Sequence, residues 1–82
     1  MHFIGENWDM IKQTIHKEYD LTNISYTTWI EPLQFSDVRN DTVYIQIPAG
    51  QAHALNYISN KYGSYFKVTI SEMMDHDYEV SF

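Results

Sequence analysis

The chain has 82 residues, of which 44% are hydrophobic and 16% aromatic, and five Lys and Arg face eleven Asp and Glu for a net charge of −6. This length predicts a single domain, residues 1–82, and the composition is too apolar for a disordered segment. The lack of cysteine excludes disulfides and thiol chemistry and favours a cytoplasmic protein. Neither a signal-peptide pattern nor an apolar run of membrane-spanning length occurs, so we expect a soluble chain without membrane contact.

The charge pattern argues against tight nucleic-acid binding. A domain that holds DNA or RNA normally carries a basic patch that displaces counterions from phosphates. Here the basic residues are scattered along the chain, whereas Glu72, Asp75, Asp77 and Glu79 gather near its end. At most weak binding of single-stranded DNA is expected.

Apolar residues recur at helical spacing near the N-terminus and predict a helix over residues 6–19. The residues of its apolar face are Trp8, Ile11, Ile15 and Tyr19, with Ile4 one turn earlier. The residues expected on its polar face are Asp9, Lys12, His16 and Lys17.

A second, short helix is predicted to end at Ile30. Thr22 or Asn23 offers an N-cap, and Tyr26, Ile30 and Leu33 are expected to turn inward. Pro32 cannot extend a helix and disfavours helical geometry at the residue before it, so we expect Glu31 to be extended.

Two strands are predicted next, over residues 33–38 and 42–47. Val43, Ile45 and Ile47 alternate with polar or amphipathic residues, which gives the second strand one apolar face. The turn residues Arg39-Asn40-Asp41 lie between the strands. An antiparallel hairpin is therefore expected.

A third helix is predicted to open at Pro48-Ala49-Gly50, with Leu55, Ile58 and Tyr62 inward. The pattern continues through Phe66, Ile70 and Met73, but Gly63 interrupts it. We expect a kink at Gly63, or a break with Ser64 capping a second piece, because glycine disfavours helix interiors. A strand over residues 65–70 is the alternative, since Val68, Thr69 and Ile70 are β-branched.

Asp75-His76-Asp77 reads as a polar loop, and the alternation of Tyr78, Val80 and Phe82 predicts a last strand. The order of elements is then ααββα(α)β. It predicts an α+β fold with a three-stranded sheet packed against helices.

These elements, with their particular residues, resemble the N-terminal domain of the bacterial chromosomal replication initiator DnaA. The features that match are Trp8 in the first helix, SYTTWIEPL at residues 25–33, DTVYIQIP at 41–48, Lys61-Tyr62 late in the third helix, and an apolar strand at the end. The resemblance covers essentially the whole chain.

The sequence departs from the family pattern after Pro48. The family typically has an Asn, one further residue and then an aromatic side chain presented at the start of the third helix. Here the text is PAGQAHALNY, in which the aromatic position falls on Gln51 or His53 and a later Trp appears as Tyr57. This leaves the fold inference intact but weakens the inference of an aromatic binding residue.

Domains of this family are similar to KH folds in topology. A KH domain grips nucleic acid with a GxxG loop, but Gly5, Gly50 and Gly63 are never three residues apart. The expected architecture is thus a small KH-like scaffold used to bind proteins.

The resemblance implies a protein–protein interaction domain of a replication initiator. It would bind the replicative DNA helicase and replication regulator proteins, and it would bring initiator copies together. Carried over by position, partner binding falls on Ser25, Thr28 and Trp29 and, less directly, on Gln51 and His53. Self-association falls on Trp8, whose other reading is a core aromatic residue.

Catalytic and metal sites are not predicted, and neither is a cofactor. The sequence contains no Walker A loop, G-x-S-x-G or H-E-x-x-H motif. Asp75-His76-Asp77 alone supplies too few convergent ligands for a metal ion, and an enzyme is not expected.

Two other functions stay open at this point. One is a KH-like single-stranded nucleic-acid-binding module, and the other is a stand-alone replication regulator that mimics the initiator domain. Codons for a linker and a Walker A loop after Phe82 would indicate a fragment of a full initiator, and a stop codon would indicate the regulator.

Overall fold

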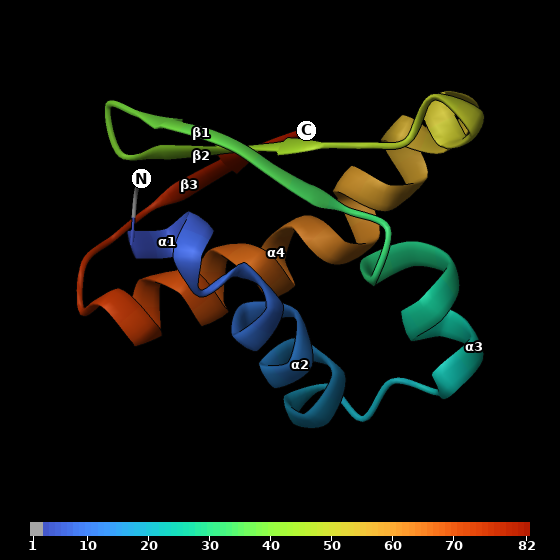
Figure 1. Ribbon diagram of the computed structural model, residues 1–82, viewed down its shortest axis with the longest axis horizontal. Coiled ribbons are helices and arrows are strands. Elements are labelled where there is room, and N and C mark those ends of the chain that lie inside the picture. The colour runs from blue at the N-terminus through green and yellow to red at the C-terminus, as the bar shows by residue number, and fades with distance from the viewer. Residues whose placement is uncertain (1–2) are drawn as a thin grey trace.

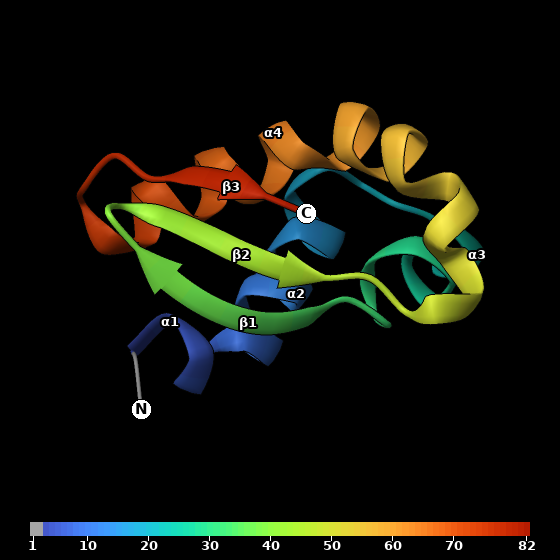
Figure 2. The same ribbon diagram turned by 90° about the horizontal axis from the view of Figure 1, so that it is seen from above.

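One mixed sheet of three strands lies over a layer of helices (Figure 1). The computed structural model of the protein describes residues 3–82. Figure 2 shows the sheet from above, with α2 and α4 behind it, so that its other face is open. This arrangement confirms the predicted α+β class and the order ααββα(α)β.

The N-terminal helical region has two pieces, α1 (Phe3–Glu6) and α2 (Trp8–Glu18). The prediction of one helix over residues 6–19 was therefore wrong at both ends and in its continuity. Asn7 separates the pieces, and its side-chain amide Nδ2 donates to Phe3 O at 2.8 Å. A side chain that bonds to nearby backbone competes with the helical ladder, which accounts for the interruption.

Lys12 lies inside the domain and not on the polar face of α2 as predicted. Only 5% of the residue is exposed, and its Nζ donates to Glu31 O at 2.8 Å and to Leu33 O at 3.4 Å. Position 12 is one helical turn after the buried Trp8, and the long aliphatic stem of a lysine can pass through apolar surroundings to reach polar groups.

The second helical segment is α3 (Asn23–Ser25) followed by the π-helical turn η1 (Tyr26–Ile30). Thr22 is its N-cap, as predicted: its side-chain oxygen accepts from Ser25 N at 3.1 Å. Glu31 is helical, with φ −56° and ψ −40°, so the prediction of an extended Glu31 was wrong. The wide turn, closed by Glu31 N donating to Tyr26 O at 2.8 Å, carries the chain on to Pro32 before it straightens.

The hairpin consists of β1 (Gln34–Arg39) and β2 (Thr42–Gln46), paired antiparallel. Asn40 and Asp41 both have positive φ, 51° and 61°, which is the backbone pattern of a two-residue type I′ turn. The register shifts between Phe35 and Asp37, which marks a bulge in β1. The predicted hairpin is confirmed.

The third helical segment begins as the 3-10 helix η2 (Ala49–Ala54) and continues as α4 (Leu55–Met74). Helix α4 passes through Gly63 without a break, so neither a helix cap at Ser64 nor a strand over residues 65–70 is found. Gly63 is buried against β3: a Cβ there would lie 3.6 Å from Phe82 Cε1. Leu55, predicted to be inward, is 41% exposed.

The last strand, β3 (Glu79–Ser81), pairs parallel to β2 and completes the sheet order β1-β2-β3. It is shorter than the predicted 78–82. Asp75 ends α4 with φ 52°, in the left-handed conformation common after helices.

The core lies between the sheet and the helices, and thirteen of the hydrophobic residues in the range 3–82 are buried in it. Its largest fully buried members include Tyr62 and Phe66 of α4, Ile11 and Ile15 of α2, and Leu33. Tyr26 and Ile30 are also buried, as predicted.

Candidate functional site

Pro32 shapes the surface on which the predicted partner-binding residues lie. A proline has no backbone N–H, so Pro32 cannot donate to Thr28 O four residues earlier as an α-helical residue would. Leu33 N, five residues after Thr28, donates to Ile30 O instead. Gln51 of η2 supplies the missing donor, with its side-chain Nε2 at 2.8 Å from Thr28 O. The bond joins η2 to η1 through two residues that are 23 positions apart in sequence.

Trp29 and Tyr57 form the aromatic part of this surface. Their ring centroids are 5.2 Å apart at an interplanar angle of 56°. Trp29 is partly buried, whereas Tyr57 is 46% exposed. Tilted aromatic pairs at this spacing are favourable, so η1 and the beginning of α4 are joined by a ring contact in addition to the Gln51–Thr28 bond.

Lys61 gives the aromatic pair a cationic border. Its Nζ donates to the Tyr57 hydroxyl at 3.1 Å and lies 5.4 Å from the centre of that ring. The hydrogen bond that Lys61 donates to the Tyr57 hydroxyl raises the pKa of Lys61, and the neighbouring Tyr62 raises it further. The ammonium group therefore stays charged over the whole physiological range.

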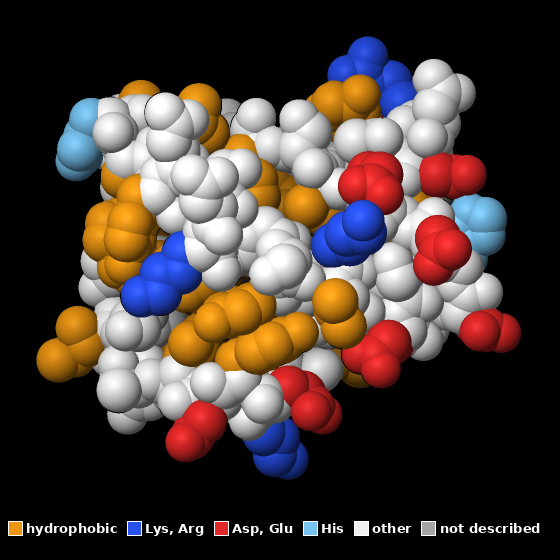
Figure 3. Space-filling view, turned by 180° about the vertical axis from the view of Figure 1, so that it is seen from behind, with side chains coloured by type: hydrophobic (Ala, Val, Ile, Leu, Met, Phe, Trp, Pro, Cys, Tyr) orange, Lys and Arg blue, Asp and Glu red, His pale blue; other side chains and the backbone are white. Residues whose placement is uncertain are grey.

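We call this region the Trp29 surface; it consists of Ser25, Thr28, Trp29, Gln51, His53 and Tyr57. The structure brings Thr28, Trp29 and Gln51 together through the contacts above. Ser25 is partly exposed one turn before Trp29, and His53 is exposed on η2 with Gln51. In Figure 3, hydrophobic side chains gather at the left-hand edge, the end of the molecule that holds α3.

Sequence reasoning missed Ile24 as an exposed residue of this region. Ile24 is 78% exposed, the most of the large hydrophobic residues described. It precedes Thr28 by four positions, and residues at this spacing lie on one face of a helix. The signal was present: an isoleucine between the capping Thr22 and the inward Tyr26 lies outside the buried stripe.

The oxygen of the Gln51 amide has an unusual environment. Gln51 Oε1 is buried and has no hydrogen-bond partner among the described residues. Since Nε2 is engaged with Thr28 O, the amide contributes one internal hydrogen bond and leaves one acceptor unused. The partner-binding role predicted for Gln51 stays a prediction, and the structure gives this residue a positional role besides.

Trp8, predicted to support self-association, lies in the core. It is 5% exposed, and its indole Nε1 donates to Leu33 O at 2.9 Å. Its ring stacks on Phe66 with centroids 5.4 Å apart, and it meets Phe35 at 5.8 Å. Self-association through Trp8 stays a prediction, and direct contact with a second copy would require the indole to leave these partners.

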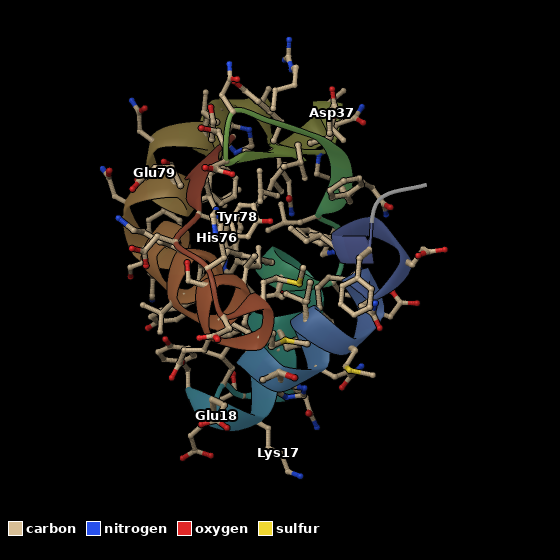
Figure 4. All side chains as sticks on the ribbon, turned by 90° about the vertical axis from the view of Figure 1, so that its left-hand side faces the viewer. Lys17, Glu18, Asp37, His76, Tyr78 and Glu79 are labelled. Carbon is tan, nitrogen blue, oxygen red and sulfur yellow. The ribbon has the colours of Figure 1, made fainter. Side chains whose placement is uncertain are left out.

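The described residues contain no cluster of three or more His, Cys, Asp or Glu side chains that could hold a metal ion. In the Asp75-His76-Asp77 loop, His76 Nε2 lies 3.1 Å from an Asp41 carboxylate oxygen of the hairpin turn. Figure 4 shows His76 beside Tyr78 at the end of the molecule away from α3. This pair joins the loop to the sheet.

Among the helices of residues 3–82, none is long and apolar enough to cross a membrane. The longest, α4, alternates its buried residues with exposed polar ones such as Asn60 and Lys67. Its apolar side packs on the sheet.

The fold and the surface define a small α+β domain in which a three-stranded sheet is covered by helices on one face and an aromatic surface lies at one end. The family model described as DnaA N-terminal domain matches residues 5–72 of the chain. The chain therefore belongs to the DnaA N-terminal domain family, a domain of replication initiators.

Relatives agree with this assignment. The chain is 33% identical over 81 residues to a protein of Lachnoclostridium phytofermentans named chromosomal replication initiator protein DnaA, covering 96% of this chain and 18% of that protein. It is 31% identical over 62 residues to proteins of the same name from Citrifermentans bemidjiense and from Geobacter sp. strain M21, covering 76% of this chain and 13% of each. The chain thus spans less than a fifth of the length of these relatives.

Proposed function

We propose that the chain is a non-catalytic protein–protein interaction domain of a replication initiator. In this role it recruits the replicative DNA helicase, receives replication regulator proteins and brings initiator copies together. Membership of the DnaA N-terminal domain family supports a role in replication initiation. The Trp29 surface is the region that we propose partner proteins contact. The observation that carries the proposal is this surface, with the η1–η2 hydrogen bond and the Trp29–Tyr57 ring contact holding two segments together.

The physical case rests on rigidity and composition. Interfaces are enriched in aromatic residues near their centres and in polar groups at their rims. Trp29 and Tyr57 fit the centre, and Ser25, Thr28 and His53 fit the rim. Because the surface is held by contacts within the domain, little ordering remains to oppose association when a partner binds.

The first test is an NMR titration of the labelled 82-residue chain with the replicative helicase of its own organism. Chemical-shift changes should cluster on the Trp29 surface. The double variant Ser25→Arg with Thr28→Arg should weaken binding more than tenfold, because two long charged side chains at the rim would keep a partner from covering the Trp29 ring, and loss of a central contact typically costs about 2 kcal/mol or more. Gln34→Arg with Ser64→Arg, two exposed sites elsewhere that add the same charge, should bind normally.

Either of two results would overturn the proposal: shifts confined to another face, or equal loss in both double variants. A single-stranded oligonucleotide, titrated at two salt concentrations, tests the other candidate function. That candidate is favoured by one observation, the Lys61 ammonium beside the exposed Tyr57 ring, since base stacking on aromatic side chains next to cations is a common mode of single-strand binding. Oligonucleotide shifts that weaken with salt, without helicase shifts, would replace the interaction domain by a nucleic-acid binder.

A further inference from the structure

A second surface of the domain lies between the last turns of α2 and α4, away from the Trp29 surface. A groove of about 440 Å³ opens there. Its lining residues are Thr14, Glu18, Tyr19, Thr69, Glu72 and Met73. Thr69 follows Tyr57 by twelve residues along α4, which is about 18 Å at the rise of an α-helix.

The groove carries two carboxylates that have no basic partner. Glu18 and Glu72 are exposed, and neither forms a salt bridge with a described residue, whereas Lys67 is paired with Glu79 at 2.9 Å. Figure 4 shows Glu18 on the side of α2 that faces α4, while the Lys17 side chain points away from it. Negative charge from both walls is therefore uncompensated within the domain.

The floor and sides of the groove are aromatic and apolar. Tyr19 stacks on Tyr65 with ring centroids 3.9 Å apart and an angle of 11°. Thr69 is 4% exposed and hydrogen-bonds to the Tyr19 hydroxyl, and Met73 is 38% exposed at the rim. In Figure 3, hydrophobic side chains run along the lower part of this face with acidic side chains beside them.

The electrostatic environment of Tyr19 agrees with this geometry. Burial raises the pKa of the Tyr19 hydroxyl, and the carboxylates of Glu72 and Glu18 raise it further. Both carboxylates are thus close enough to act on one atom in the groove. A cation placed there would be attracted by both.

We propose that this groove is a second docking site, and that it takes an arginine side chain flanked by apolar residues on a partner protein. The guanidinium group would lie between the Glu18 and Glu72 carboxylates, which it can engage through several N–H donors at once. Its aliphatic stem and apolar neighbours would cover Met73 and the Tyr19–Tyr65 stack, to which a guanidinium is also attracted. The choice of partner chemistry follows from charge complementarity, which favours basic segments on a domain of net charge −6.

The test is an NMR titration of the 82-residue chain with a nine-residue peptide that holds one arginine between leucines. A peptide with glutamate in place of the arginine is the comparison. The arginine peptide should shift the signals of Thr14, Tyr19, Thr69 and Met73, and the glutamate peptide should leave them unchanged. Glu18→Gln with Glu72→Gln should weaken arginine-peptide binding about tenfold, as expected when two exposed ion pairs, each contributing up to about 1 kcal/mol, are lost.

The matched control is Glu6→Gln with Asp77→Asn, which removes the same charge from exposed positions outside the groove. It should bind the arginine peptide as the parent chain does. Equal loss in the control would mean attraction by net charge alone, and shifts centred on Trp29 would place the peptide elsewhere; both results overturn the docking site. The groove variant leaves the Trp29 surface unchanged. Helicase binding by that variant therefore tests the proposed function separately from the arginine-peptide test.

Discussion

Pro32 leaves one carbonyl oxygen of the second helical segment without its helical donor, and a single side chain compensates. Gln51 Nε2 bonds to Thr28 O at 2.8 Å. The proline explains why this oxygen is available, and Gln51 explains how η2 is positioned next to η1. A residue carried over from the family as a partner contact is therefore also part of the domain's internal structure.

Replacing Gln51 by methionine should test this positional role. Methionine keeps the length of the side chain but cannot donate a hydrogen bond, so Thr28 O loses its donor. We expect the free energy of unfolding to fall by about 1 kcal/mol, the typical value of such a bond. Urea unfolding followed by circular dichroism measures the change.

His53→Ala is the control for Gln51→Met, because His53 is exposed on the same short helix. It should leave the unfolding midpoint unchanged. A Gln51→Met chain as stable as the parent would show that water satisfies Thr28 O as well as Gln51 does.

Trp8 provides the second prediction for a single residue. Trp8→Phe keeps an aromatic ring beside Phe66 but removes the N–H that donates to Leu33 O. We expect the free energy of unfolding to fall by about 1–3 kcal/mol. Leu33 O would keep only the longer hydrogen bond from Lys12, and the smaller ring would leave a cavity. Thermal unfolding gives this value.

Sedimentation of the folded Trp8→Phe chain separates stability from self-association. Because the indole is buried, the variant should associate as the parent does at any concentration where both are folded. Met10→Ala, which changes an exposed residue two positions after Trp8 in the same helix, is the control for α2. Loss of association in folded Trp8→Phe alone would indicate that the indole reaches a second copy through a rearranged state.

At the scale of elements, glycines decide how α1 and α4 pack. A Cβ added to Gly63 would lie 3.6 Å from Phe82 Cε1, an ordinary contact distance. Alanine also favours helix by roughly 1 kcal/mol over glycine. Gly63→Ala should therefore raise the free energy of unfolding by about 0.5–1 kcal/mol.

Gly5→Ala should have the opposite sign although Gly5 is also helical. Its Cβ would lie 2.8 Å from two atoms of the Phe35 ring, which is itself packed against Trp8. Overpacking of this kind costs about 1–3 kcal/mol. This cost exceeds the stability that alanine adds to a helix relative to glycine. Denaturant unfolding of both variants checks the pair, and a stabilising Gly5→Ala would show that the Phe35 ring moves freely.

The elements that the sequence predicted well have their determinants close together in the chain. Thr22 caps the helix that follows it by accepting a hydrogen bond from Ser25 N, three residues later. The Asn40-Asp41 turn sets the register of the hairpin that it joins. Two of the errors involve partners far away: Lys12 is buried because Glu31 O and Leu33 O accept its hydrogen bonds, and α4 passes through Gly63 because β3 packs against it. Such contacts exist only in the folded chain.

In the candidate site, too, some features are determined by nearby residues and others by contacts between distant segments. The inward positions Tyr26 and Ile30 and the partly exposed Ser25, Thr28 and Trp29 follow from helical spacing alone. The bond from Gln51 to Thr28 O and the Trp29–Tyr57 ring contact join segments more than twenty residues apart. They depend on how η2 folds back onto η1, which no local pattern encodes.

At the scale of the whole molecule, tyrosines in the core or packed against it link stability to alkaline pH. Burial raises the pKa of Tyr19, Tyr26 and Tyr62 above 10.0, and the nearby carboxylates Glu72 and Glu31 add to this for Tyr19 and Tyr26 respectively. Raised values mean that the folded state holds these protons more tightly than the unfolded state. Their contribution is complete below pH 10.0 and is lost as the pH rises through the folded-state values.

The urea midpoint should therefore decline from about pH 10 upward, where free tyrosine ionises. Tyr26→Phe should reduce the slope of this decline, because phenylalanine cannot ionise and the ring stays in the core. Tyr44→Phe, on the open face of the sheet, is the matched control, and it should leave the slope unchanged. A decline as steep in Tyr26→Phe as in the parent would show that ionisation of Tyr26 does not drive alkaline unfolding.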